Sequence, residues 1–268
     1  MVEQGWIVGI YTATPVLGLA RVPVILGPEA SSVQQFWQLD RQLAAEMHIC
    51  LDSFISSVEW SALAGIAVAV GPGSFTGCRL GVTVARCLGR NLKIPVYGIS
   101  TLDAWASSVF QTRSGNPELL QPELLQPELL QPELLQNEGS DLEKGFDEVA
   151  VRLDAKRGQW YGSVYQRDPS QIIGGLIACV EEQLWTLQEW EDMLRQRKRA
   201  ALVHEIIEPV QNPPVLALTQ LAQQAYQQGS RPPWQDVLPH YGRQPPIDPA
   251  VFKAVVPSVT PEAFLPKR

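Results

Sequence analysis

The stretch GPGSFTGCRLG, residues 71–81, follows the apolar run GIAVAV and leads into VTVARCLGRNL. A short apolar run bounded by glycine and proline is typical of a buried strand, and the residues after the turn have the apolar spacing of a helix. A strand, a glycine turn and a helix in this order predict an α/β fold. The sequence on both sides of the turn extends the pattern.

The segments around the turn alternate between strand and helix. WIVGIYTA and LGLARVPVIL are strand-like and joined at Thr12–Pro15, which predicts an opening hairpin. Apolar residues at three- or four-residue intervals predict a helix over Ser32–Val58, and a second helix is expected over Thr76–Asn91. IPVYGIS is a further buried strand, and a helix follows it with Ser100 or Thr101 as its cap.

Four copies of PELLQ occupy Pro117–Gln136. A proline every five residues forbids a continuous helix, and the period is too short for the usual solenoid repeats. We favour an expanded surface loop. The leucine pairs leave a dedicated binding element open as the alternative.

A second sheet is expected after this insert. EVAVRLDAKRGQWYGSVYQRD has the pattern of a hairpin that turns at Gly158, and WTLQEWEDMLRQRKRA and LALTQLAQQAYQQG have the pattern of helices, the latter ending at Gly229. The expected organisation is a first lobe at 1–110, a connecting loop with the insert at 111–147, a smaller second lobe with a return segment at 148–243, and a proline-rich tail at 244–268.

Composition limits the function classes. The chain has 268 residues and a formal net charge of −7, which argues against a broad basic surface that binds nucleic acid unaided. Its four cysteines lack CxxC spacing, which favours reduced thiols. Glu3 and the prolines and glycines that interrupt the apolar N-terminal run argue against a signal or a membrane span, so a cytoplasmic protein is expected.

The glycine turn lacks the spacing of the known phosphate-binding loops. A Walker A loop needs Gly-Lys after four residues, and no lysine follows Thr76. The dinucleotide fingerprint is G-x-G-x-x-G, whereas this turn reads G-x-G-x-x-x-G. What remains is a structural helix cap, which we favour, or an anion site at the helix N-terminus. The candidate anion-site residues are Gly71, Gly73, Ser74, Thr76, Gly77 and Arg79.

Hydrolase and metal chemistry find little support in the sequence. The three histidines, His48, His204 and His240, lie far apart and form no HExxH pair, and Ser74 lies in no G-x-S-x-G turn. No catalytic residue and no metal ligand are therefore predicted. His240, in LPHYGR, is the histidine that is kept as a candidate.

The run from Gly71 to Ala106 resembles the TsaB (YeaZ) family, bacterial proteins of threonylcarbamoyladenosine tRNA modification. The signature residues are Gly71, Pro72, Gly73, Ser74, Phe75, Thr76, Gly77, Arg79 and Gly81. Weaker likeness lies in VGIYTAT, in DAKRGQWY and in VLPHYGR, so that the resemblance spans about positions 5–243 apart from the insert.

The resemblance implies a two-lobed, actin-like α/β fold of the Hsp70 and sugar-kinase type. It also implies a platform without catalytic activity of its own, which activates the catalytic subunit TsaD in threonylcarbamoyl transfer to tRNA adenosine and is joined by the ATPase TsaE. No cofactor is required, weak ATP or ADP binding is allowed only at the complex, and tRNA is reached through the complex. The competing hypothesis is a stand-alone ATP-dependent kinase or phosphohydrolase of the actin-like class.

One residue departs from the family pattern. Tyr11 stands where the family usually has an aspartate, which in actin-like folds helps to manage Mg²⁺ and phosphate. A phenol with a pKa of about 10 is a poor substitute for an anionic ligand of magnesium. Metal-assisted ATP chemistry is therefore not expected of this chain.

The resemblance points to the first two helices as the contact surface for TsaD, and the same helices are candidates for self-association as a homodimer. Apolar residues on a surface helix are what such a contact needs. The candidate partner-interface residues are Phe36, Leu43, Met47, Phe54, Leu80 and Val84. The alternative is that these side chains fill the core of their own lobe.

Overall fold

The computed structural model describes residues 5–25, 31–55, 60–113, 148–167, 175–197, 201–206 and 210–240. The PELLQ insert and the predicted tail at 244–268 lie outside the described residues. The predicted domain boundaries remain predictions. Among the helices of the described part, none is long and apolar enough to cross a membrane.

A five-stranded mixed sheet forms the first lobe, in the order β3-β2-β1-β4-β5. The predicted hairpin is confirmed, because β1 (Trp6–Tyr11) pairs antiparallel with β2 (Val16–Pro23), which pairs in turn with β3 (Val33–Gln38). The two apolar runs beside the glycine turn are β4 (Leu63–Gly71) and β5 (Val96–Ser100), and both run parallel to β1.

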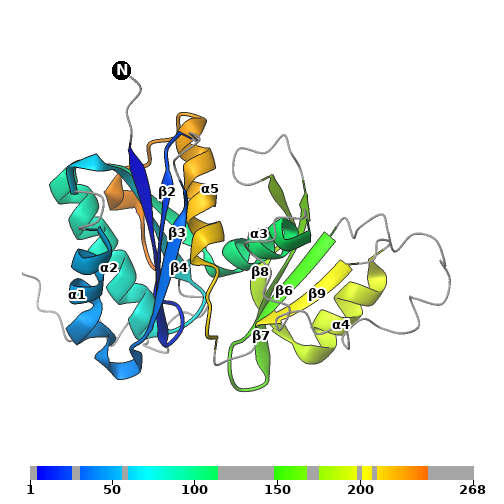
Figure 1. The fold of residues 1–268 in the computed structure, drawn as a ribbon. Coiled ribbons are helices and arrows are strands. Elements are labelled where there is room, and N and C mark those ends of the chain that lie inside the picture. The colour runs from blue at the N-terminus through cyan, green and yellow to red at the C-terminus, as the bar shows by residue number, and fades with distance from the viewer. Residues whose placement is uncertain are drawn as a thin grey trace, which may run out of the picture.

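Helices cover both faces of this sheet (Figure 1). α1 (Leu43–Ile55) and α2 (Phe75–Leu92) lie on one face, and α5 (Val215–Gln227) lies on the other. Each face has its own apolar core, which explains why β1, β2 and β4 are buried almost throughout. The first lobe is therefore a sheet between two helical layers.

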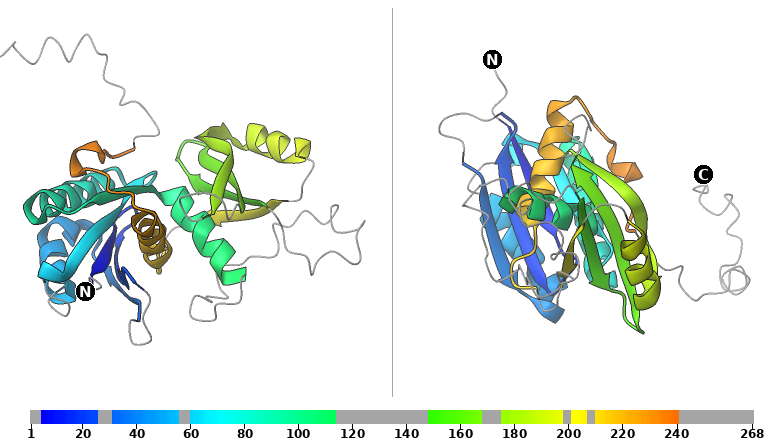
Figure 2. Two further views of the ribbon diagram at one scale, coloured as in Figure 1. Left: turned by 90° about the horizontal axis from the view of Figure 1, so that it is seen from above. Right: turned by 90° about the vertical axis from the view of Figure 1, so that its right-hand side faces the viewer.

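The second lobe is a four-stranded sheet in the order β8-β7-β6-β9. The predicted hairpin at Gly158 is β6 (Glu148–Asp154) with β7 (Gln159–Arg167), and Lys156, Arg157 and Gly158 all have positive φ at its tip. β8 (Leu176–Thr186) and β9 (Ala201–Ile206) complete the sheet and were not predicted. α3 (Thr101–Arg113) packs on this sheet and against α5, and so lies between the lobes (Figure 2).

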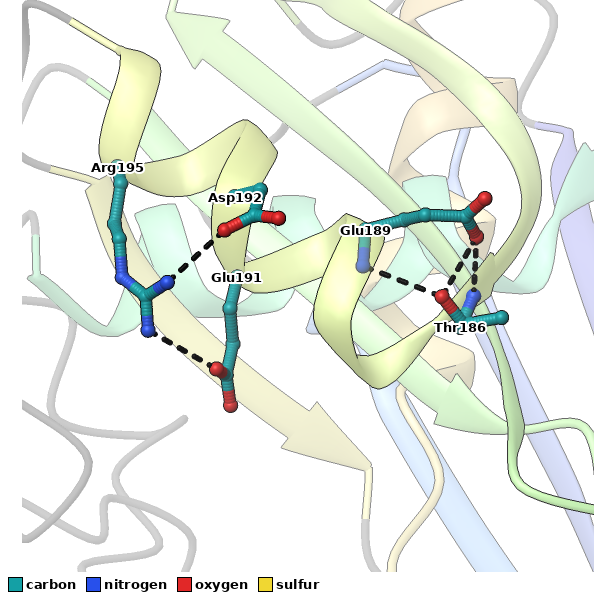
Figure 3. Close-up of polar contacts among 5 residues, drawn as sticks. All are labelled: Thr186, Glu189, Glu191, Asp192 and Arg195. Atoms are coloured by element: carbon teal, nitrogen blue, oxygen red, sulfur yellow. Dashed lines mark hydrogen bonds and ion pairs between the residues drawn. The ribbon is translucent and has the colours of Figure 1, made fainter.

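The other helix of the second lobe, α4 (Leu187–Gln196), is built from local interactions. Thr186 and Glu189 form a capping box, in which the Glu189 amide donates to the Thr186 hydroxyl at 3.2 Å and the Thr186 amide donates to the Glu189 carboxylate at 2.8 Å (Figure 3). Trp190, 1% exposed, anchors the helix against Ala150 and Val164 of the sheet.

The predicted helix over Ser32–Val58 is wrong at its start. Residues 33–38 form β3, the edge strand of the first sheet, a 3-10 turn follows at Asp40–Gln42, and α1 begins only at Leu43. The apolar spacing from Phe36 to Leu43 matched a helix because seven residues are close to two helical turns. Strand pairing with β2 decides the conformation of this stretch, and the helical pattern did not contain that information.

The chain returns to the first lobe after α4 and β9. α5 packs on β1, β2 and β4, and the 3-10 turn η8 (Trp234–Asp236) packs on α2. The segment then reaches the glycine turn, where the amide of His240 donates to the Val70 carbonyl at 2.8 Å. Residues near position 240 thus lie beside residues 70–71.

Candidate functional site

The glycine turn is packed directly onto the first hairpin. The Ser74 amide donates to the Ala13 carbonyl at 2.7 Å, and the Thr12 hydroxyl donates to the Gly77 carbonyl at 2.8 Å. A Cβ at Gly77 would overlap the Thr12 carbonyl oxygen, and one at Gly73 would overlap Ala13. Glycine is required at both positions because two backbones meet there.

The same turn starts α2. Ser74 is the N-cap residue, and its hydroxyl accepts a hydrogen bond from the Gly77 amide at 3.2 Å. The helix begins at Phe75, one residue before the predicted start. Thr76 and Arg79 are exposed, and the Arg79 guanidinium lies over the Phe75 ring at 5.2 Å. These contacts account for the turn as a structural cap, and anion binding there stays a prediction.

The structure brings five of the six predicted interface residues to one face of the first sheet. Leu43, Met47 and Phe54 of α1 are buried in the core between α1, α2 and the sheet. Leu80 and Val84 of α2 pack half-buried against the same core. The apolar character of the α1 residues is therefore explained by their own lobe, which was the alternative, and their part in an interface stays a prediction.

Phe36 does not join the other five. It lies on β3, where it is half-buried against the core under α5, on the opposite face of the sheet. Phe36 was included among the predicted interface residues because a helix was predicted over Ser32–Val58, and residues three or four apart in a helix fall on one side. In a strand the side chains alternate between faces, so Phe36 points away from α1.

The outer face of α2 carries a feature that the sequence reasoning did not use. Arg79, Arg86 and Arg90 lie on this helix, and no acidic residue occurs from position 75 to 92. The Arg86 and Arg90 guanidiniums lie over the Trp234 ring at 5.6 and 5.8 Å. The signal was available in the sequence as a repeat of arginines at helical spacing, whereas Trp234 comes from the return segment.

A polar cluster joins the two lobes beside the glycine turn. The Ser100 hydroxyl, at the end of β5, donates to Glu182 Oε2 of β8 at 2.6 Å, and His240 Nε2 lies 3.5 Å from Glu182 Oε1. Asp103, in the first turn of α3, interacts with the Tyr165 hydroxyl of β7. His240 was the histidine kept as a candidate, and Glu182 is the partner that the sequence could not identify.

Burial sets the protonation of this cluster. Burial raises the pKa of Glu182, while the Ser100 hydrogen bond and the nearby His240 act in the opposite direction. Burial also raises the pKa of Asp103, and the bond from Tyr165 partly offsets it. Burial and the neighbouring Asp103 raise the pKa of Tyr165 well above its ordinary value. Burial therefore favours the neutral forms of Glu182, Asp103 and Tyr165, and the contacts of Glu182 with Ser100 and His240 connect the lobes.

The position of the expected aspartate does not fit a magnesium site. Tyr11 ends β1 and is fully buried among apolar side chains of the α5 core. A buried neutral phenol is a poor ligand for a hard cation. Across the described residues, no group of three or more histidine, cysteine, aspartate or glutamate side chains is arranged to hold a metal ion.

Sequence comparisons give a consistent set of relatives. A family model described as tRNA N6-adenosine threonylcarbamoyltransferase, TsaD, matches residues 40–122. The tRNA threonylcarbamoyladenosine biosynthesis protein TsaB of Bacillus subtilis is 30% identical over 141 residues, which cover 52% of this chain and 45% of that protein. TsaB of Escherichia coli is 28% identical over 110 residues, or 41% and 34%. The chain spans less than half the length of these curated relatives.

Solved structures give the fold. A Pseudomonas aeruginosa protein described as uncharacterized, with similarity to peptidase YEAZ, superposes with a TM-score of 0.61 at 18% identity, covering 89% of this chain and all of the other. YeaZ from Pseudomonas aeruginosa gives a TM-score of 0.59 at 20% identity, covering 88% and 99%. The predicted α/β fold of the two-lobed, actin-like type is confirmed.

Proposed function

We propose that this chain is a member of the TsaB (YeaZ) family and a non-catalytic partner and activator of TsaD in threonylcarbamoyladenosine biosynthesis, a proposal that its sequence similarities support. TsaD supplies the catalytic site for transfer to tRNA adenosine, and TsaE joins the pair. The chain works in the cytoplasm and reaches tRNA through the complex. It requires no cofactor, and weak ATP or ADP binding belongs to the complex.

The proposal rests mainly on the close packing of the signature glycines against the first hairpin. Gly73, Gly77 and Gly81 are each packed against Thr12 or Ala13, so the motif seats α2 on the first hairpin. A helix held in this way presents its outer side chains at fixed positions, which favours recognition by a partner. Tyr11 supports the same conclusion, because it replaces the acid that nucleotide chemistry would use with a buried phenol.

The proposal is tested by reconstitution. Threonylcarbamoyl transfer to tRNA is measured with TsaD and TsaE of the same organism, with and without this chain. We expect transfer to fall at least about tenfold when the chain is omitted, which corresponds to a barrier that is higher by about 1.4 kcal/mol. Full transfer without the chain would contradict the proposal.

A second assay separates the activator from the competing kinase or phosphohydrolase. Phosphate release from ATP is measured with the chain alone and with a Ser74→Ala, Arg79→Ala double variant. We expect no release above background from either protein. Steady release by the wild type that the double variant loses would favour the actin-like enzyme.

The interface within this proposal is the outer side of α1 and α2. Met47 is 2% exposed, so a charge placed there would unfold the lobe and report nothing about binding. Exposed positions are the useful ones: Ile49 on α1 is 60% exposed and Phe75 on α2 is 56% exposed. Replacing both by glutamate is expected to weaken TsaD binding while the melting temperature changes by only a few degrees.

A further inference from the structure

Residues 237–240 lie directly against the glycine turn, and we call this segment the strap. The His240 amide donates to the Val70 carbonyl at 2.8 Å, and a Cβ at Gly71 would lie only 2.8 Å from the His240 carbonyl oxygen. Gly71 has a φ of 118°, so its backbone conformation favours glycine as well. The first residue of the signature turn is therefore fitted to the strap.

One buried residue anchors the strap to the first lobe. Val237 is 5% exposed, and a Cβ at Gly98 would lie 3.1 Å from its side chain. Beyond Val237 the strap lies at the surface, since Leu238 is 62% exposed and the His240 side chain is 48% exposed. Among the described residues, a single backbone hydrogen bond, to Val70, holds the end of the strap. A segment with so few contacts opens locally more readily than the sheet beneath it.

The second lobe supplies the other contact of the strap. Glu182, on β8, accepts a hydrogen bond from the Ser100 hydroxyl at 2.6 Å through Oε2, and its Oε1 lies 3.5 Å from His240 Nε2. The two contacts are unequal, because 2.6 Å is a short hydrogen bond and 3.5 Å is beyond the usual range. Glu182 Oε1 is buried and accepts no hydrogen bond from the described residues, which disfavours its burial. The contact with the strap is therefore the weaker of the two.

We propose that the strap is a conformational device, which Glu182 holds closed against the glycine turn and which opens when the second lobe moves away from the first. When β8 moves, the Glu182 carboxyl leaves His240, and the end of the strap then depends on its single backbone hydrogen bond. Opening uncovers Gly71, where the absence of a side chain makes room for the strap. The inference concerns contacts within this chain and does not depend on the proposed function.

Hydrogen exchange at single amides of the full chain, followed by NMR, tests this inference. The His240 amide reports opening of the strap, and the Ile66 amide, which is hydrogen-bonded within the first sheet, reports opening of the lobe. Glu182→Gln removes the carboxylate charge and keeps a side-chain oxygen that can accept a hydrogen bond. Glu181→Gln makes the same change at the neighbouring exposed residue of β8 and is the matched control.

We expect the His240 amide to exchange at least about tenfold faster in Glu182→Gln than in the wild type, and to stay within about twofold in Glu181→Gln. The Ile66 amide should be unchanged in both variants. The free energy of unfolding should not fall in Glu182→Gln, because burying a neutral amide costs less than burying a carboxylate.

Two further variants separate the parts of the device. His240→Ala removes the other half of the weaker contact, so the protection of that amide should fall as it does in Glu182→Gln, and this variant provides the test if Glu182→Gln fails to fold. Ser100→Ala leaves the strap itself unchanged and removes the bond that holds Glu182 to β5. We expect the His240 amide to exchange faster in this variant too, by a smaller factor.

Four results would overturn the inference. Unchanged exchange at His240 in Glu182→Gln, or an equal increase in Glu181→Gln, would mean that the Glu182 carboxyl does not hold the strap. An equal increase at Ile66 would mean that Glu182 supports the whole first lobe instead. Unchanged exchange at His240 in Ser100→Ala would mean that the strap opens independently of the second lobe.

Discussion

Helix α2 carries three arginines and helix α4 carries one, and the contacts of these arginines differ between the two helices. In α4, Arg195 pairs with Asp192 at 3.0 Å and with Glu191 at 3.2 Å, so the charge is neutralised within the helix (Figure 3). In α2, the arginines rest on Phe75 and Trp234, and the helix contains no acid. The charge of Arg195 is thus balanced within α4, whereas the arginine charges of α2 are not balanced within their helix, which is consistent with the proposed docking of a partner on α2.

The two helices also begin differently. α4 begins at an exposed capping box made by two neighbouring side chains, Thr186 and Glu189. α2 begins where glycines allow its first turn to meet the Thr12–Ala13 backbone, so its start depends on a hairpin more than 60 residues earlier in the chain. A substitution at the start of α2 should therefore destabilise the first lobe as a whole, whereas a substitution at the start of α4 should destabilise α4 alone.

The largest expected effect is at the start of α2. Gly77→Val forces a side chain against the Thr12 carbonyl and should lower the free energy of unfolding by about 3 kcal/mol or more. Gly158→Ala is the control, since its Cβ meets nothing within 4 Å and only its positive φ opposes the change, at about 1 kcal/mol. Urea unfolding measures both. Equal losses would mean that the close approach at Gly77 contributes nothing.

The cap of α4 should have a smaller effect. Thr186→Ala removes the hydroxyl that accepts from the Glu189 amide and should cost about 1 kcal/mol. Hydrogen exchange should show faster opening of α4 alone. Faster exchange in α2 as well would contradict the expectation that loss of the Thr186 cap affects α4 alone.

First-turn acids of α3 and α4 should respond to pH in opposite directions. Burial raises the pKa of Asp103 in the folded chain, so wild-type stability relative to Asp103→Asn falls as pH rises from the ordinary carboxyl range through the raised value. The Thr186 amide lowers the pKa of Glu189, so wild-type stability relative to Glu189→Gln is present at neutral pH and is lost as pH falls through the lowered value. Urea unfolding from pH 3 to 7 measures both differences, and slopes of the same sign would contradict the assignment.

The smallest expected effect is on stability when an exposed arginine is removed. Arg90→Ala and Arg195→Ala should each change the free energy of unfolding by less than about 1 kcal/mol, because a surface stack and a surface ion pair both contribute little. The two variants should differ in TsaD binding instead. A large loss of stability for Arg90→Ala would mean that the stacking of Arg90 on Trp234 is needed for folding.

Sequence reasoning predicted what depends on nearby residues. The hairpin around Thr12–Pro15, the strand and helix on either side of Gly71, and the turn at Gly158 follow from composition and spacing, and all are confirmed. β3 was misassigned because strand pairing with β2 outweighs a helical spacing. Contacts between distant segments could not be predicted from local patterns. Glu182 contacts Ser100, which lies 82 positions earlier in the chain, and Trp234 contacts α2 only after the chain has passed through the second lobe.

Hydrogen–deuterium exchange with and without TsaD tests most directly whether TsaD binds on α1 and α2. We expect slower exchange in peptides from α1, residues 43–55, and α2, residues 75–92, when TsaD is added, and unchanged exchange in α4, residues 187–196. The same experiment on the Arg86→Glu, Arg90→Glu variant should lose the protection of α2. Protection confined to α4 and the second sheet, with exchange in α1 and α2 unchanged, would contradict the proposed binding of TsaD on α1 and α2.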